Sequence, residues 1–316
     1  SGASHVAMSP AGASQIRVTR ERAGQLMRRA TYASVTVACI LILAKLIAWQ
    51  ATGSVSLLAT LVDSMLDGLA SLVNLVAVRH ALSPADAEHR FGHGKAEALA
   101  GLGQALLITG SALYLLVESS QRLLQPEPLT AVGLGMGVMV LSIVLTGALL
   151  AFQRHVIRLT GSTAISADEL HYRTDLLVNG SVLLALGLSY WGWQGFDALA
   201  ALFIALYILS SAVGIVRQAS DHLMDRELPD SEREAIQALV RQHPRVRGMH
   251  DLRTRQSGVA IFIQLHLELD DELDLLSAHS ISYEVEKVLQ QAYPGAEIII
   301  HLDPTSVVGV EPRQTF

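Results

Sequence analysis

The sequence predicts a membrane protein in two parts, an all-α transmembrane domain of six helices followed by a small cytosolic α+β domain. Three observations predict this fold class. Only 16% of the 316 residues are charged and 51% are hydrophobic, whereas a soluble domain usually carries about 25% charged residues. Six long apolar windows follow one another before residue 217. Beyond that point the chain becomes polar and acidic.

Each apolar window is long enough to cross a hydrocarbon core of about 30 Å as a helix. Gly and Ser are frequent inside the windows, as close helix packing in lipid requires. The windows are Ala30–Ala51, Val55–Val78, Ala96–Val117, Thr130–Phe152, Asp175–Trp191 and Asp197–Val216. Lys45, inside the first window, is expected to extend its ammonium group to a membrane interface.

Basic residues in the connections predict the orientation, because Lys and Arg accumulate on the cytosolic side. The basic connections contain Arg17, Arg20, Arg22, Arg28 and Arg29 before the first window, Arg79, Arg90 and Lys95 after the second, and Arg154 and Arg158 after the fourth. The other three connections contain only Arg122. Both termini are therefore expected in the cytosol. The polar, Arg-bearing start of the chain does not read as a signal peptide.

The segment after the last window reads as an independent domain with 10 Lys and Arg against 17 Asp and Glu, a net charge of −7. Its patterns predict the order αββαβ, which is typical of a ferredoxin-like or metallochaperone-like domain. The predicted elements are a helix over Pro229–Gln242, strands at Met249–Arg255 and Val259–Asp270, a helix striped by Ile281, Val285, Val288 and Leu289, and a strand at Glu297–Leu302. The predicted boundaries are a disordered tail at 1–25, the membrane domain at 26–217, the cytosolic domain at 218–304 and a tail at 305–316.

Composition and motifs exclude several classes of protein. Cys39 is the single cysteine, which excludes a disulfide framework and a cysteine metal site. The net charge of −6 gives no support to nucleic-acid binding. The absence of HExxH, P-loop and GxSxG motifs argues against a membrane protease, an ATP-driven pump and a serine hydrolase.

Two pairs of polar residues stand within the predicted spans. Asp63 and Asp67 are four residues apart, hence on one helix face, and no basic residue between Val55 and Val78 offsets them. A charged Asp at mid-bilayer costs about 2.5–3.5 kcal/mol, which a bound cation would offset. His171 and Asp175 repeat the spacing, and the four side chains together can form a tetrahedral shell for Zn²⁺. The alternative is that they are protonated packing groups or lie near an interface.

The connection after the second window carries Asp86, His89 and His93, three potential metal ligands within eight residues. Spacing alone leaves two interpretations open. The cluster binds a metal, or it is a solvated polar loop in which His93 and the following Gly form a turn.

The cytosolic domain carries a third cluster of potential ligands on polar positions, namely His250, Asp251, His266, His279, His301 and Asp303. Alternation places His266 on the polar face of its strand, and His301 and Asp303 share one face of the last strand. Asp303 could bridge two metal ions. Scattered surface histidines are also ordinary, so the residues alone leave a metal site and a solvated surface both open.

Several longer motifs resemble the cation diffusion facilitator family, and in particular its bacterial YiiP-like branch of zinc and ferrous-iron efflux antiporters. The resemblance covers nearly the whole chain beyond about residue 25. The motifs are LVDSMLDGLAS, HRFGHGKAE, ADELHYRTD, HLMDRELP, HDLRTRQSG and IIIHLDP.

The resemblance implies a role for each cluster. The transport site would comprise Asp63, Asp67, His171 and Asp175, and a loop site Asp86, His89 and His93. A cytosolic binuclear site would comprise His250, His266, His279, His301 and a bridging Asp303, with Asp251 supporting the ligands. Lys95 and Asp225 would form a charge interlock at a dimer interface.

The resemblance also implies a secondary active transporter and not an enzyme. It would be a homodimer in the bilayer of the bacterial inner membrane that exports a divalent metal, Zn²⁺ first and also Cd²⁺ or Fe²⁺, in exchange for protons. Zn²⁺ would be both substrate and regulatory ion, with no organic cofactor and no nucleic-acid partner. Two other functions are weighed against this one. A membrane metal sensor needs no ligands at membrane depth, and a metallohydrolase needs an open position on its metal, which a four-ligand shell lacks.

Overall fold

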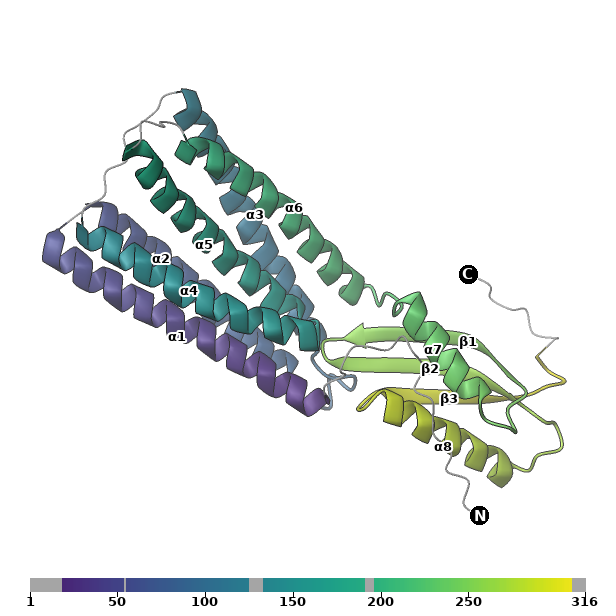
Figure 1. Cartoon of the computed structure of the whole chain (residues 1–316). Helices are drawn as coiled ribbons and strands as arrows, with labels where there is room; N and C mark the ends of the chain where they lie inside the picture. The colour runs from purple at the N-terminus through teal and green to yellow at the C-terminus, as the bar shows by residue number, and fades with distance from the viewer. Residues whose placement is uncertain (1–18, 54, 125–132, 191–195, 309–316) are drawn as a thin grey trace, which may run out of the picture.

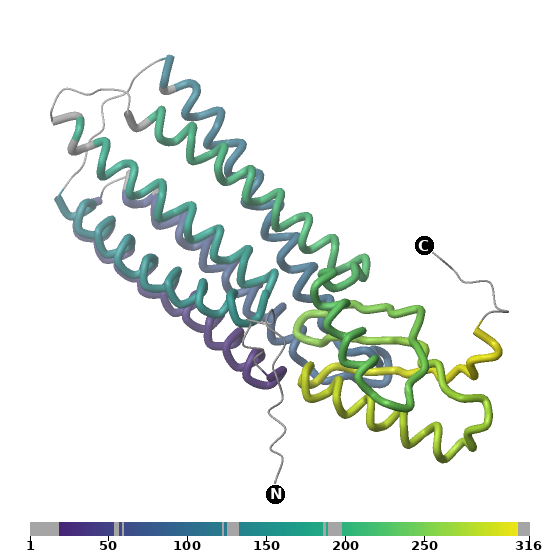
Figure 2. Tube along the Cα trace, turned by 45° about the vertical axis from the view of Figure 1, so that its right-hand side comes forward, coloured from purple at the N-terminus to yellow at the C-terminus, as the bar shows by residue number. Residues whose placement is uncertain are grey.

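The computed structural model describes residues 19–53, 55–124, 133–190 and 196–308. Six long helices form a bundle, and a small α+β domain lies at one end of it (Figures 1 and 2). Residues 1–18 of the predicted N-terminal tail and 309–316 of the C-terminal tail lie outside the described ranges, as do Thr130 and Trp191 at the ends of two predicted windows.

The bundle helices are α1 Arg20–Thr52, α2 Val55–Ala81, α3 Lys95–Leu124, α4 Gly133–Thr160, α5 Thr163–Tyr190 and α6 Phe196–Leu223. Helix α1 begins inside the predicted tail, where Thr19 caps it by accepting a hydrogen bond from the backbone of Arg22. Five helices of the described chain have the length and hydropathy to cross a membrane, and α5 is not among them. It carries Asp168, Glu169, Arg173 and Asp175, and it begins well before its predicted window.

Small side chains let the bundle helices approach closely. Ala105 and Ala112 of α3, Ala167 of α5 and Ala212 of α6 are all buried in one cluster with Ile208. Helix α3 packs along α6 and α1 packs along α2, and both views show α5 running between these pairs. Every charged residue of α5 therefore has another helix beside it.

The cytosolic domain consists of α7 Asp230–Arg241, β1 Gly248–Ser257, β2 Ala260–Leu269, α8 Leu275–Ala292 and β3 Glu297–Pro304. Its sheet has the order β1-β2-β3, in which β1 and β2 are antiparallel, and β2 and β3 are parallel. Helix α8 makes the crossover that the parallel pair requires. The predicted order αββαβ is therefore confirmed.

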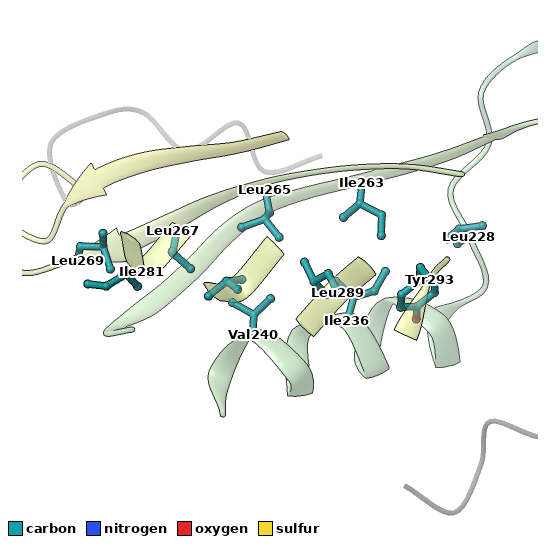
Figure 3. Close-up of a cluster of buried hydrophobic side chains, with 11 residues drawn as sticks. Leu228, Ile236, Val240, Ile263, Leu265, Leu267, Leu269, Ile281, Leu289 and Tyr293 are labelled. Carbon is teal, nitrogen blue, oxygen red and sulfur yellow. The ribbon is translucent and has the colours of Figure 1, made fainter. Parts of the chain in front are cut away.

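One face of the sheet is apolar and carries the core of the domain (Figure 3). Ile263, Leu265 and Leu267 alternate along β2 and pack against α7 and α8, where Ile236 and Leu289 are fully buried. Successive side chains of a strand point to opposite faces. The residues between them, Gln264 and His266 among others, therefore lie on the face that the helices leave uncovered.

The two parts of the chain meet where the loop before α3 contacts the β1–β2 turn. A Cβ atom on Gly94 would lie 2.4 Å from the backbone oxygen of Ser257, so a larger residue does not fit there. Gly258 in the turn has φ +58°, which favours glycine. Next to this contact, the Phe91 and Phe262 rings lie 6.0 Å apart. The chain thus places the α2–α3 loop directly on the sheet.

Candidate metal-binding sites

The polar pairs predicted for the second and fifth spans meet inside the bundle. His171 Nε2 of α5 lies 3.0 Å from Asp67 Oδ1 of α2 and 3.9 Å from Asp175 Oδ2. One ligand atom from each of the three lies within 4.8 Å of the other two. Their side chains are 20–31% exposed, so the group is partly accessible. An imidazole and two carboxylates at this spacing are a donor set suited to Zn²⁺.

Asp63 and Lys45 lie near the group of three ligand atoms but outside it. Asp63 is one turn from Asp67 and exposed, and the group does not include it. Lys45 Nζ donates to the backbone oxygen of Thr60, at 3.2 Å, and to Ser64 Oγ, so α2 supplies acceptors that the sequence of α1 alone does not reveal. The expected position of Lys45 at a membrane interface stays a prediction.

The exposure of α5 changes at the level of this group. From Ser162 to Tyr172 nearly every residue is buried, whereas residues 173–183 are only partly buried. The buried half is the one nearer the cytosolic domain. The metal group is therefore covered on the cytosolic-domain side and more open on the opposite side.

A hydrogen-bonded carboxylate lies within the buried half. Asp168 is fully buried, and its carboxylate accepts hydrogen bonds from Ser34 Oγ of α1 at 2.5 Å, Gln104 Nε2 of α3 at 3.2 Å and Gln153 Nε2 of α4 at 2.7 Å. Tyr172 Oη adds a hydrogen bond to the backbone oxygen of Ser34 at 3.2 Å. This network joins α5 to three other helices, α1, α3 and α4, on the cytosolic-domain side of the metal group.

An ion cluster on the outer side of α5 also escaped prediction. The buried carboxylate of Glu169 accepts hydrogen bonds from Arg154 Nε of α4 at 2.9 Å and Arg173 Nε at 3.0 Å. Arg173 Nη1 also donates to Tyr207 Oη of α6 at 2.5 Å. The signal available in the sequence was the presence of Asp168 and Glu169 shortly before His171, because acids that become buried in a bundle need hydrogen-bond or charge partners.

The loop cluster is assembled as its spacing predicts. Asp86, His89 and His93 offer ligand atoms within 4.8 Å of one another. His93 Nε2 lies 3.2 Å and His89 Nδ1 3.4 Å from the Asp86 carboxylate. The backbone N–H of His89 donates to that carboxylate and is the largest cause holding the pKa of Asp86 below its ordinary value. Asp86 is thus kept in the deprotonated form that a metal ligand requires.

The register of the three strands brings the histidines of the cytosolic cluster side by side. His250 pairs with His266 across β1 and β2, and His266 pairs with His301 across β2 and β3. Asp303 lies among them, with Oδ2 at 2.7 Å from His266 Nδ1 and 3.4 Å from His250 Nε2, and Oδ1 at 3.2 Å from His301 Nε2. The two oxygens of Asp303 thus face different imidazoles. This donor set fits two cations that share one carboxylate.

Two predicted members of the cytosolic cluster, Asp251 and His279, lie outside the group of ligand atoms formed by His250, His266 and Asp303. Asp251, at φ +47°, has Oδ2 3.8 Å from His266 Nε2 and Oδ1 3.1 Å from Arg253. His279 lies exposed on α8, and within the described residues it is not part of the ligand group formed by His250, His266 and Asp303.

Lys95 and Asp225 form an ion pair within one chain. Lys95 Nζ lies 3.1 Å from Asp225 Oδ2, and Arg255 Nη1 lies 3.3 Å from the other oxygen. The pair joins the start of α3 to the segment after α6, where the bundle ends.

Comparisons with known proteins cover both parts. Residues 31–224 match the cation efflux transmembrane domain, and residues 228–305 match the cation efflux protein cytoplasmic domain. The cation-efflux pump FieF of Klebsiella pneumoniae is 52% identical over 293 residues, covering 93% of this chain and 98% of the pump. FieF of Salmonella choleraesuis is 51% identical over 291 residues, covering 92% and 97%. The metal-bound C-terminal domain of the CzcD transporter from Thermotoga maritima is 24% identical, with a TM-score of 0.24, over 27% of this chain and 100% of that domain. The two family matches and the two FieF relatives show that the chain belongs to the cation efflux, or cation diffusion facilitator, family of membrane transporters.

Proposed function

We propose that this protein exports Zn²⁺ from the cytosol in exchange for protons, with Asp63, Asp67, His171 and Asp175 as the transport site. Efflux of divalent cations is the activity of the family. The observation that carries the proposal is the meeting of Asp67, His171 and Asp175 inside the bundle. One imidazole with carboxylates favours Zn²⁺ and also accepts Cd²⁺ and Fe²⁺, whereas an all-oxygen site would favour Mn²⁺ or Mg²⁺.

Proton exchange follows from the chemistry of the ligands. Carboxylates and imidazole bind a metal only when they are deprotonated, so metal and protons exclude each other from the site. When the site faces the more acidic compartment, protons displace the metal. When it faces the cytosol, metal displaces the protons. The exchange then needs only a site that opens to each side in turn.

Alternating access is supported by the uneven burial along α5. The side toward the cytosolic domain is closed by packed residues and by the Asp168 network, and the opposite side is less tightly surrounded. This arrangement corresponds to an outward-open form. Opening inward would break the hydrogen bond between Asp168 and Gln104, because it joins α5 to α3.

The remaining assignments extend the same proposal. The membrane domain comprises residues 26–217 and the cytosolic domain 218–304, and both termini lie in the cytosol of a bacterial cell with the protein in its inner membrane. Two chains form a homodimer in which Lys95 and Asp225 lie at the interface. The loop site and the cytosolic site, including His279 and Asp251, bind Zn²⁺, and the cytosolic site regulates transport.

The test is metal flux in proteoliposomes with an imposed pH gradient. We expect Zn²⁺ uptake driven by an outward proton gradient, release of protons in step with it, and loss of both in Asp67→Ala. A panel of Zn²⁺, Cd²⁺, Fe²⁺ and Mn²⁺ on one reconstituted sample ranks the substrates. Zn²⁺ movement that ignores the pH gradient would refute proton exchange.

A further inference from the structure

His80 lies beside the loop cluster although it is outside the loop. It stands in the last turn of α2, and its ring centroid is 4.6 Å from that of His93, with the planes tilted by 56°. The rings of His89 and His93 are 4.7 Å apart, tilted by 46°. Three imidazoles therefore stand in a row, with His93 in the middle.

The cytosolic cluster shows the same spacing. The rings of His250 and His266 are 5.0 Å apart, and those of His266 and His301 are 4.6 Å apart. Two imidazoles on one tetrahedral Zn²⁺, with Zn–N bonds of about 2.0–2.1 Å, have ring centroids about 5 Å apart. His80 and His93 are thus at the distance of two ligands of one ion.

A short turn fixes this arrangement. The backbone N–H of Ser83 donates to the backbone oxygen of His80 at 3.0 Å, and the Ser83 hydroxyl donates to the same oxygen. Ser83 Oγ also lies 3.4 Å from His93 Nδ1. The end of α2 is therefore held next to His93, while His93 Nε2 faces Asp86 at 3.2 Å.

The shell of the loop cluster has a place for another ligand. Asp86, His89 and His93 supply three, and a tetrahedral ion takes four. The nitrogens of His80 are outside the group that lies within 4.8 Å, but its side chain is exposed and can rotate toward that group. We propose that His80 is the fourth ligand of the loop site, completing a shell of three imidazoles and one carboxylate for Zn²⁺ or a similar cation. The proposal rests on the loop site being a metal site, as proposed above.

A fourth protein ligand changes what the site does. Four protein ligands around one ion, with no position left for water, is the arrangement of structural zinc sites. A closed shell would connect the end of α2 to the start of α3, next to the contact between Gly94 and Ser257. The loop ion would then brace the junction between the two parts of the protein.

The experiment isolates the loop site in the full-length protein. A background variant, Asp67→Ala with Asp303→Ala, removes a ligand from each of the other clusters, and it is titrated in detergent with Co²⁺ while the visible absorption is recorded. Three further variants are made in this background. They are His80→Gln, His93→Gln and, as a matched surface control on α4, His155→Gln.

We expect His80→Gln to weaken Co²⁺ binding by at least about tenfold, since even residues that only support a ligand contribute about 10–100-fold to affinity. It should also weaken the intense absorption of four-coordinate Co²⁺ as water replaces the imidazole. His155→Gln should change neither quantity. If His80→Gln leaves the Co²⁺ affinity and spectrum unchanged while His93→Gln abolishes both, His80 is not a ligand, although the loop site itself still stands. No binding in the background variant would overturn the loop site itself, while Zn²⁺ flux by the wild type tests efflux separately.

Discussion

His171 Nε2 lies 3.0 Å from Asp67 Oδ1, so a residue of α5 and a residue of α2 meet inside the bundle. Asp175 adds its carboxylate from the next turn of α5, 3.9 Å from the same nitrogen. The first distance joins α5 to α2, which are also joined by hydrogen bonds between the Ser71 and Tyr172 hydroxyls, at 2.7 Å, and from Asn74 Nδ2 to the backbone oxygen of Ala164, at 3.5 Å.

Removing a carboxylate from the transport site should abolish transport. We expect Asp67→Asn and Asp175→Asn each to lower Zn²⁺ flux by at least about tenfold, because each removes a ligand and its charge. The measurement is flux in proteoliposomes at matched protein content. Glu234→Gln, at an exposed position on α7, is the control and should transport normally. Wild-type flux in both Asp variants would remove the transport site from this place.

Asp168→Asn should destabilise the membrane domain. Three donors, from Ser34, Gln104 and Gln153, point at this buried carboxylate, and an amide would turn a donor of its own toward at least one of them. We expect a loss of about 1–3 kcal/mol, the cost of an unsatisfied buried polar group. Thermal unfolding in detergent measures it, with the exposed Asp230→Asn as control. Equal melting temperatures for the two variants would contradict the structural role of the network.

Zinc should stabilise the cytosolic domain through the row of histidines on its sheet. A ligand at 100 times its dissociation constant stabilises the folded state by about 2.7 kcal/mol. We expect the melting temperature of segment 218–316 to rise with Zn²⁺ and to return on adding a chelator. His266→Ala should remove most of the rise because His266 lies between His250 and His301. His279→Ala should remove less of the Zn²⁺-induced rise in melting temperature. A larger loss in His279→Ala than in His266→Ala would contradict the central position of His266 in the cluster.

The pair of Arg247 and Asp270 should give the cytosolic domain an acid-dependent stability. Two hydrogen bonds from Arg247, 2.8 and 2.7 Å long, lower the pKa of Asp270 below its ordinary value. A lowered folded-state pKa means that the stabilisation is complete above the unfolded pKa of about 3.9 and is lost as the pH falls through the folded value. Urea unfolding of segment 218–316 and its Asp270→Asn variant measures this. The difference in unfolding free energy between the two proteins should be constant near neutral pH and shrink in acid. A difference that does not change with pH would contradict a stabilising role of the Arg247–Asp270 pair.

Gly94→Ala should separate the two parts of the protein at their contact. The new Cβ would lie 2.4 Å from the Ser257 oxygen, so the α2–α3 loop and the β1–β2 turn must move apart. We expect faster proteolysis between the bundle and the cytosolic domain. Gly103→Ala is the matched control, since its Cβ meets no atom within 4 Å and alanine favours a helix. Equal proteolysis of both variants would show that the contact is not needed.

Local sequence patterns predicted the helices and strands whose hydrophobic residues repeat with one regular spacing. Apolar windows gave the positions of five bundle helices, whereas α5 begins at Thr163, well before its predicted window. Alternation around His266 gave the polar face of β2. The i,i+4 spacing correctly paired His171 with Asp175 on one helix face, and the structure brings Asp67, which the sequence analysis grouped with them, beside both. These features depend on the repeat of a single helix or strand, which the spacing of residues along the sequence determines.

Other features depend on which helices become neighbours. The buried carboxylate of Asp168 accepts hydrogen bonds from Gln104 and Gln153, which come from different helices. The hydrogen bond from Lys45 to the backbone of Thr60 likewise depends on the packing of α1 against α2. The position of His80 beside His93 results from the turn at Ser83. None of these neighbours follows from spacing along the sequence.

The change of burial along α5 has a consequence for anyone handling the protein. On the proposed transport site, buried residues surround the ion on the side that carries the αββαβ domain, so we expect a chelator supplied from that side not to reach it. We expect the same chelator to remove the ion from the opposite side, where α5 is only partly buried. Stripping the purified protein of metal will therefore depend on which face of a sealed vesicle the reagent contacts.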